Sequence, residues 1–120
     1  MDMLTRAGWV ALALLHLIPV LPFFAPALVE RLYGVPASGE AGVLLVHRGA
    51  LFLGVLVAAL VAAWQPEARR VASVVAAISM VGFLLAYARA GFPTGSLRKI
   101  AVADLLGLAP LLFVAWQAWR

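Results

Sequence analysis

The sequence predicts an all-α integral membrane protein, a four-helix bundle with antiparallel up-and-down spans and a proline-kinked first helix. Hydrophobic residues make up 66% of the 120 positions and charged residues only 12%, with a mean hydropathy of +1.07, so polar groups are too few to enclose a soluble core. Four apolar blocks, at residues 7–29, 42–64, 71–90 and 100–119, are each long enough to cross a hydrocarbon layer about 30 Å thick. They lack the alternation of barrel strands, which favours helices. We therefore expect one transmembrane domain over residues 1–120.

The first block contains HLIPVLPFFAP, a histidine followed by three prolines. Each proline lacks a backbone N–H and disturbs the hydrogen bond to the carbonyl four residues earlier, which predicts a kink. At roughly 100° per residue, one helix face collects the histidine, prolines and an acid: His16, Pro19, Phe23, Pro26 and Glu30. Freed carbonyls are tolerated where they line protein or water. We expect this face to point inward, towards a cavity.

Turn-forming segments separate the other blocks: GVPASGEAG at 34–42, QPEARR at 65–70 and GFPTGSLRK at 91–99. The middle segment is short, so the second and third helices should form an antiparallel hairpin. Four spans then place both termini and the 65–70 loop on one side, which we call the terminal side. The 34–42 and 91–99 loops lie on the opposite side, the loop side.

Basic residues give a weak orientation signal. The terminal side carries Arg6, Arg69, Arg70 and Arg120, and the loop side carries Arg31, Arg48, Arg89, Arg98 and Lys99. If Arg48 and Arg89 are partly buried and are set aside, the basic residues lean towards the terminal side. Because cytoplasmic loops are enriched in Lys and Arg, we expect cytoplasmic termini.

The two sides also differ in their other residues. Tryptophans, which favour the membrane interface, fall on the terminal side at Trp9, Trp64, Trp116 and Trp119. Unusual polar residues gather on the loop side at Glu30, Tyr33, Glu40, His47, Arg48, Tyr87, Arg89, Arg98, Lys99 and Asp104. A site, if present, is predicted to open on the loop side.

Three helices bring ionisable groups to similar depths: His47 and Arg48 on the second, Tyr87 and Arg89 on the third, and Asp104 on the fourth. Charges inside the apolar band are costly, so they usually face a partner or a wet cavity. An arginine fork can satisfy a carboxylate at two points, which predicts an Arg48–Asp104 structural clamp between two helices. Three interpretations stay open: a clamp alone, a clamp that also orients a ligand, and charged side chains that snorkel to the interface.

Arg98 and Lys99 lie in the first turn of the fourth helix, where exposed amides attract anions. They predict contact with a lipid phosphate or with the acidic head of a ligand, and ordinary headgroup contact is the simpler alternative. The full set of predicted ligand-binding residues is His16, His47, Arg48, Tyr87, Arg89, Arg98, Lys99 and Asp104.

Several site classes are excluded or disfavoured by residue content. The chain has no cysteine, which rules out disulfides and thiolate ligands. A haem held by His16 and His47 is disfavoured because the two residues lie at different depths, and neither has a second ligand three or four residues away for a metal. The basic residues stand singly, which argues against a nucleic-acid partner. We expect no metal and no resident cofactor other than a bound quinone or lipid.

Several short motifs carry a family resemblance: the proline after His16, LYG at 32–34, HRGALF at 47–52, the loop around Pro66 and RKIAVAD at 98–104. Together they resemble the DoxX-like short four-helix proteins of the bacterial inner membrane, and more closely a group often labelled phosphopantetheine adenylyltransferase. Such an enzyme needs a soluble nucleotide-binding α/β domain with an HxGH motif, and the sequence has neither. The resemblance implies a compact multi-pass bundle in that membrane, with His47, Arg48 and Asp104 as characteristic polar positions and a loose association with quinone-linked redox systems.

Three functions remain open at this point. The favoured hypothesis is a non-catalytic protein that binds an amphipathic small molecule, a quinone or lipid, in a polar cavity on the loop side. The second is a small transporter working as a homodimer with membrane lipid around it, suggested by the four spans and the near-balanced flanking charges. It differs from the small multidrug exporters, which use a glutamate in the first helix where this chain has only His16. The third is an intramembrane isomerase with His16 or Asp104 as acid or base. The first hypothesis is favoured because the polar residues crowd on one side.

Overall fold

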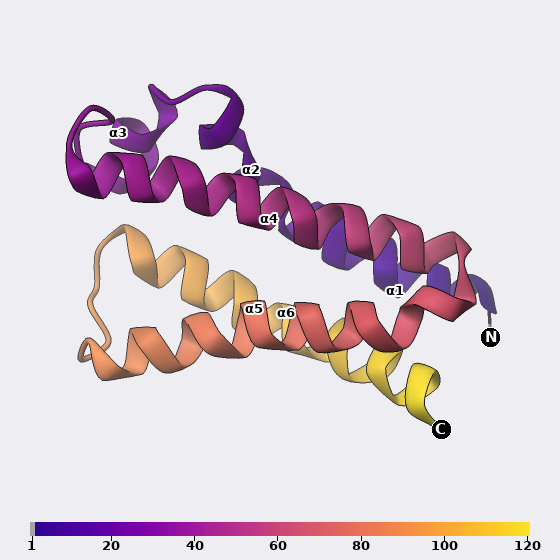
Figure 1. Ribbon diagram of the computed structural model, residues 1–120. Helices are drawn as coiled ribbons and strands as arrows, with labels where there is room; N and C mark the ends of the chain where they lie inside the picture. The colour runs from indigo at the N-terminus through magenta and orange to yellow at the C-terminus, as the bar shows by residue number, and fades with distance from the viewer. Residues whose placement is uncertain (1) are drawn as a thin grey trace.

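The computed structural model describes residues 2–120, and these are helical along most of their length (Figure 1). The elements are α1 (Asp2–Leu15), α2 (Leu17–Phe24), α3 (Leu28–Tyr33), α4 (Glu40–Trp64), the 3₁₀ turn η1 (Pro66–Ala68), α5 (Arg69–Arg89) and α6 (Ser96–Trp119). No strand occurs in this described range, which confirms the all-α prediction.

Three stretches are long and apolar enough to cross a membrane: α4, η1 with α5, and α6. The pair α1 and α2 becomes a fourth candidate if it is taken as one span bent by 42°. These three or four candidates indicate a membrane protein. The bend agrees with the predicted kink in the first helix.

The break between α1 and α2 falls at His16, one turn before Pro19. Pro19 has no N–H to offer the carbonyl of Leu15, and its ring crowds that carbonyl, so the helix yields in the preceding turn. The His16 N–H is shared between the carbonyls of Leu12 and Ala13, at 3.3 and 3.1 Å. This shared hydrogen bond tightens the helix turn at His16, and the bend is located there.

The first helical region ends earlier than the sequence predicts. It stops at Phe24, and a turn at residues 25–27 leads into α3, which Gly34 closes with a φ of 73°. His16 and Pro19 face inward as predicted, but Phe23, Pro26 and Glu30 are exposed. The prediction of one shared face was wrong from Phe23 onwards. Beyond α2 the reason is that a constant angle per residue holds only while the helix continues.

The helices pack so that both termini lie at one end of the molecule and the loops before α4 and α6 lie at the other (Figure 1). The helix α1 packs against α4 and α6, α2 packs against α4, and α5 packs against α6 and α4. Close approach of α2 and α4 occurs at Gly49, where an added Cβ would lie 3.2 Å from the carbonyl oxygen of Pro19.

Trp9 is a core residue and does not lie at the lipid interface as predicted. Its side chain is 0% exposed, whereas the other three tryptophans are more than half exposed. The reason is the row of small side chains on α4 and α5, which leaves room for an indole ring inside the core cluster: Ala59, Ala62, Ala63, Ala72 and Ala76.

The terminal side is closed by arginines that bond to helix ends. Arg69 donates from Nε to the carbonyl of Ala62 at 2.7 Å and from Nη2 to the carbonyl of Ala63 at 3.1 Å. Its Nη1 also reaches Oδ1 of Asp2 at 3.3 Å. Since the last carbonyls of a helix have no partner within it, Arg69 caps α4 and joins it to α1 and α5.

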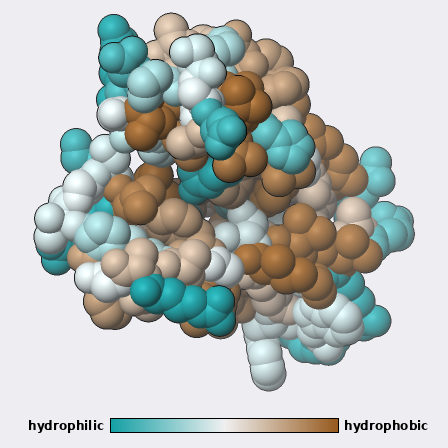
Figure 2. Space-filling view, turned by 60° about the vertical axis from the view of Figure 1, so that its left-hand side comes forward, coloured by the Kyte–Doolittle hydropathy of each residue, from teal (hydrophilic) through white to brown (hydrophobic). Residues whose placement is uncertain are grey.

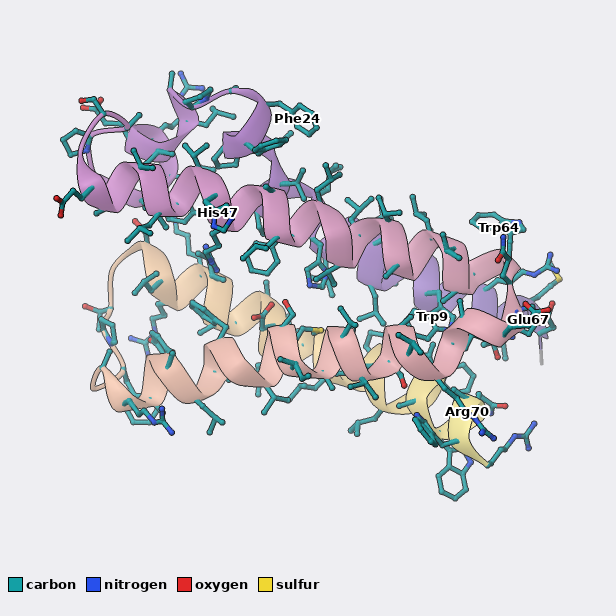
Figure 3. All side chains as sticks on the ribbon, in the orientation of Figure 1. Trp9, Phe24, His47, Trp64, Glu67 and Arg70 are labelled. Carbon is teal, nitrogen blue, oxygen red and sulfur yellow. The ribbon has the colours of Figure 1, made fainter. Side chains whose placement is uncertain are left out.

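A second polar connection joins α5 to α6 at this end. Arg70 donates from Nε to the carbonyl of Ala118 at 3.1 Å, and its guanidinium lies over the ring of Trp119 at 5.1 Å. Nε1 of Trp119 donates to Oγ of Ser73 at 2.9 Å, and Ser73 donates to the carbonyl of Arg70 at 2.7 Å. Figure 3 shows Arg70, Trp64 and Glu67 gathered at this end, away from His47.

Candidate functional site

Two cavities lie towards the loop side, on either side of the first turns of α6. We call them the Asp104 cavity, of about 380 Å³, and the Arg98 cavity, of about 330 Å³. Both volumes are within the range of small-molecule sites. Figure 2 brings the loop side forward and shows hydrophilic side chains placed among broad hydrophobic surface around a recess.

The Asp104 cavity lies between the bent first helices and α6. The α1–α2 side of its wall is apolar and consists of Leu14, Leu15, Ile18 and Pro19. Leu14 is 63% exposed and Ile18 is 60% exposed, so this part of the rim lies on the outer surface of the molecule. The cavity therefore opens sideways between two helices.

The polar residues of the Asp104 cavity come from α6 and α3. Ser96, Lys99 and Asp104 follow one another along α6, and Tyr33 faces them from the end of α3. At 1.5 Å per residue, the span from Ser96 to Asp104 is about 12 Å. The cavity is thus an elongated space with one apolar wall and one wall carrying an amine, a hydroxyl, a phenol and a carboxylate.

Arg48 lies beside this cavity in a cage of three aromatic rings. Its guanidinium carbon is 4.6 Å from the ring centre of Phe52, 5.4 Å from that of Phe83 and 5.9 Å from that of Tyr33. Arginine over such ring faces is attracted electrostatically. Nη1 donates to the hydroxyl of Tyr33 at 3.3 Å, while Nη2 is buried and has no hydrogen-bond partner among residues 2–120.

The predicted Arg48–Asp104 clamp is not formed as a direct ion pair. No salt bridge joins them within 4.0 Å in the described part of the chain, although their charges are close enough to interact. The guanidinium is held by Tyr33 and the aromatic rings instead. Tyr33 connects the aromatic cage around Arg48 with the Asp104 cavity, since its hydroxyl accepts a hydrogen bond from Arg48 and its side chain lines the cavity.

His16 is buried at the α1–α2 break and lines neither cavity. It is 3% exposed, its Nδ1 lies 2.7 Å from the carbonyl oxygen of Leu12, and its ring centre is 5.6 Å from that of Phe52. A carbonyl oxygen can only accept, so Nδ1 carries the proton in this hydrogen bond. The imidazole supports the helix break from inside.

Arg98 and Lys99 belong to different cavities. Adjacent helical residues are rotated by about 100°, so Arg98 faces the α5 side and Lys99 the α1–α2 side. Tyr87, also on the α5 side, donates its hydroxyl to the carbonyl of Pro93 at 2.7 Å, and this bond holds the loop before α6.

His47 and Arg89 are exposed and line neither cavity. Sequence reasoning also left three ring-bearing neighbours of Arg48 out of the site, namely Tyr33, Phe52 and Phe83. One of them had a usable signal: Phe52 follows Arg48 by four residues, which puts the two on the same helix face. The positions of the other two depend on how separate helices pack.

The side chains that line the two cavities can form hydrogen bonds and charge–charge interactions. Across residues 2–120 no three side chains of His, Asp or Glu gather as a metal site. The chain was compared with protein-family models, with curated proteins and with solved structures, and none of them matches. The DoxX-like resemblance therefore stays a prediction, and function has to be argued from the two cavities.

Proposed function

We propose that this protein is a multi-pass membrane bundle that binds an amphipathic small molecule, a quinone or lipid, in the Asp104 cavity. The observation that carries this proposal is that the polar residues of the cavity all lie on its α6 and α3 side, interspersed with Leu32, Ile100 and Ala103, while its α1 and α2 side is entirely apolar. An amphipathic ligand matches both walls at once. Its oxygen-bearing head lies beside Tyr33 and Asp104, and its apolar part lies along Leu14 and Ile18.

The same proposal includes a membrane topology. The bent α1–α2 pair crosses as one span, so four antiparallel spans form the bundle, with the termini in the cytoplasm of a bacterium. The common end of the two termini and the apolar lengths of the helices support this arrangement. In this setting the exposed rim at Leu14 and Ile18 faces lipid tails, so an apolar ligand reaches the cavity from within the bilayer.

In the Asp104 cavity, the polar head of the ligand meets the hydroxyl of Tyr33, whose hydrogen-bonding direction is set by Arg48. Arg48 already donates to the oxygen of Tyr33, so the phenolic proton of Tyr33 is left to donate elsewhere. A carbonyl or other acceptor oxygen on the ligand satisfies it, and the cation behind the phenol strengthens that bond. Asp104 accepts from a hydroxyl, and Lys99 is placed nearer the start of α6 to meet a negative group.

Binding is favoured over transport or catalysis because His16 is withdrawn from the cavity. The transporter hypothesis relies on His16, and the isomerase hypothesis keeps only Asp104, the second of its two candidates, in contact with the cavity. His16 instead bonds the Leu12 carbonyl and lines neither cavity. We assign no catalytic residue.

A test compares Tyr33→Phe with Tyr87→Phe, since each loses one hydroxyl and keeps its ring. Binding of a decyl-substituted benzoquinone and of phosphatidylcholine to the purified protein is measured by native mass spectrometry from mild detergent. Tyr33→Phe is expected to weaken binding of one of these probes by about tenfold, the value of one hydrogen bond of roughly 1.4 kcal/mol. Tyr87→Phe should leave binding intact. The proposal fails if neither probe binds the wild type, or if the two variants bind equally.

A further inference from the structure

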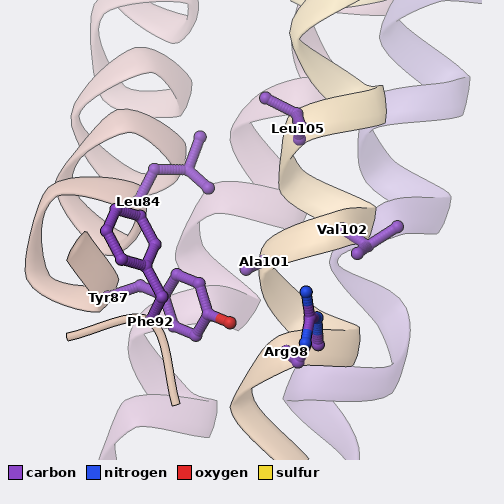
Figure 4. A pocket seen from close by; sticks show the side chains of 7 residues that line it. All are labelled: Leu84, Tyr87, Phe92, Arg98, Ala101, Val102 and Leu105. Carbon is purple, nitrogen blue, oxygen red and sulfur yellow. The ribbon is translucent and has the colours of Figure 1, made fainter. Parts of the chain in front are cut away.

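The Arg98 cavity is an apolar groove with a single charge. Leu84 and Tyr87 of α5 and Phe92 of the following loop form one side, and Ala101, Val102 and Leu105 of α6 form the other. Figure 4 shows Leu84, Tyr87 and Phe92 opposite Ala101 and Leu105, with Val102 on the other flank of α6 and Arg98 at the end nearest the start of that helix. The apolar part of the groove therefore extends from the arginine along α6.

The aromatic side of this groove is held firmly. The ring of Tyr87 stacks on Phe83 at 6.2 Å and meets Phe92 edge-on at 5.8 Å, and its hydroxyl is fixed by the carbonyl of Pro93. Phe92 has a φ of 56°, which costs a residue other than glycine about 1 kcal/mol or more. Its N–H bonds the carbonyl of Tyr87 at 3.2 Å, which keeps the ring at the edge of the groove.

Arg98 is the one charged residue that lines this groove, and it is exposed. Both ion pairs among residues 2–120 are made by arginines of the terminal side, Arg6 and Arg69, with Asp2. No carboxylate lies within salt-bridge distance of Arg98 in that range. The groove thus presents an uncompensated cation at one end of an apolar channel.

We infer that the Arg98 cavity is a seat for an anionic phospholipid, with the phosphate on Arg98 and one acyl chain along Leu84, Val102 and Leu105. The charge complements an anionic headgroup, and the apolar walls need a chain attached to that phosphate. The inference uses the membrane topology proposed above, since that topology puts Arg98 at the headgroup level. It does not depend on the occupant of the Asp104 cavity.

The first experiment compares the loss of Arg98 with the loss of another basic residue of the loop side. The full-length protein is reconstituted with equal amounts of phosphatidylglycerol and phosphatidylcholine, extracted in mild detergent, and analysed for retained lipid by native mass spectrometry. Arg98→Gln should lower retention of phosphatidylglycerol by about fivefold, the size expected for one basic side chain at an anionic lipid. The matched control Arg89→Gln removes the same charge from an exposed residue of the loop side that lines neither cavity, and should retain the lipid as the wild type does.

The second experiment tests the groove without changing charge. Val102→Trp fills the channel while Arg98 remains, and it should also lower phosphatidylglycerol retention several-fold. Leu112→Trp, at an exposed position of α6 outside the groove, is its control. A several-fold excess of inorganic phosphate should not displace the lipid.

Three results would overturn the inference. If Arg98→Gln retains as much phosphatidylglycerol as the wild type, Arg98 does not hold the phosphate. If Arg89→Gln loses as much as Arg98→Gln, the lipid is retained by surface charge and not by the Arg98 cavity. If Val102→Trp has no effect, or inorganic phosphate displaces the lipid, the site recognises phosphate alone. Arg98 and Val102 do not line the Asp104 cavity, whose ligand is tested by Tyr33→Phe, so failure here is separable from failure of the proposed function.

Discussion

The terminal side and the loop side use the same type of side chain in opposite ways. On the terminal side, Arg69 makes two hydrogen bonds to carbonyls at the end of α4 and an ion pair with Asp2. On the loop side, Arg48 makes one bond of 3.3 Å and keeps a buried nitrogen without a partner. Where helix ends supply acceptors, arginine stabilises the fold. Where rings surround it, arginine is left able to bind something else.

The cavities follow the same division. Both of them lie around the start of α6 on the loop side, whereas the core cluster around Trp9 fills the other half of the molecule. Small alanines and a large indole pack together in that core. Near the loops, the bend at His16 and the early end of α2 prevent the helices from closing in the same way. The proline-rich segment therefore accounts for the Asp104 cavity, which Ile18 and Pro19 line, whereas the Arg98 cavity lies between α5, α6 and the loop that joins them.

The largest effect should come from breaking the terminal side at Arg69. Arg69→Met keeps most of the side-chain volume but leaves the carbonyls of Ala62 and Ala63 without their donors. Hydrogen bonds from charged groups contribute about 1.5–3 kcal/mol each, so we expect a loss of about 3 kcal/mol or more in the free energy of unfolding. Thermal or SDS unfolding in detergent micelles measures it.

Arg6→Met is the control for Arg69→Met, since Arg6 pairs with the same Asp2 but only at the surface. Exposed pairs contribute little, so its effect should stay below about 1 kcal/mol. Equal losses in the two variants would mean that capping of α4 is not what holds the terminal side together.

The next largest effect concerns the contact that supports the bend. Gly49→Ala would place a Cβ 3.0 Å from the backbone nitrogen of Phe23 and 3.2 Å from the carbonyl of Pro19. Backbone cannot move aside as a flexible side chain can, so we expect a loss of about 1–3 kcal/mol in the free energy of unfolding. Measured by the same unfolding assay, Gly54→Ala on the same helix should instead be neutral or stabilising, because nothing lies within 4 Å of its added Cβ.

The helix positions were largely predictable, because long apolar runs bounded by turn residues define them. The block predicted at 42–64 is the helix Glu40–Trp64, and that at 71–90 is Arg69–Arg89 after a 3₁₀ turn. The first block was not predictable to the same degree. Hydropathy stays high across Phe24, yet the chain turns there and begins a separate helix. Apolar composition says that a segment is buried in lipid or protein, but it does not say where a proline-rich helix ends.

The sequence predicted on which side of the molecule the candidate site lies, but it did not predict which side chains contact one another there. The cost of burying charge drew attention to Arg48 and Asp104 near the loops, and Asp104 lines a cavity there. The hydrogen-bond partner of Arg48 was not predicted. A carboxylate on α6 and a phenol on α3 both complement a guanidinium, and only the packing of α3 against α4 decides between them. Likewise, the sequence places Arg98 and Lys99 together, while the rotation of the helix separates them.

A smaller effect is expected at the α5–α6 connection. Trp119→Phe removes the indole donor to Ser73 and keeps an aromatic ring near Arg70. One neutral hydrogen bond contributes about 1 kcal/mol, so the midpoint of unfolding should fall slightly. Trp116→Phe, at a more exposed tryptophan, is the control and should change it less. If both substitutions act equally, the loss reflects aromatic anchoring in the micelle rather than the bond to Ser73.

We expect the smallest effect on stability at Arg48. Its substitution is also the most direct test of the contrast between the arginines of the terminal side and those of the loop side. Arg48→Met removes a cation whose Nη2 is buried without a partner, and it leaves an apolar side chain among Phe52, Phe83 and Tyr33. A buried donor without a partner costs about 1–3 kcal/mol, which offsets the attraction to the rings. Unfolding should therefore change by less than about 1 kcal/mol in either direction, while binding of the benzoquinone or the lipid probe by the Asp104 cavity weakens. A loss of stability as large as that of Arg69→Met would show that the arginines of both sides are structural, and the contrast between the two sides would then disappear.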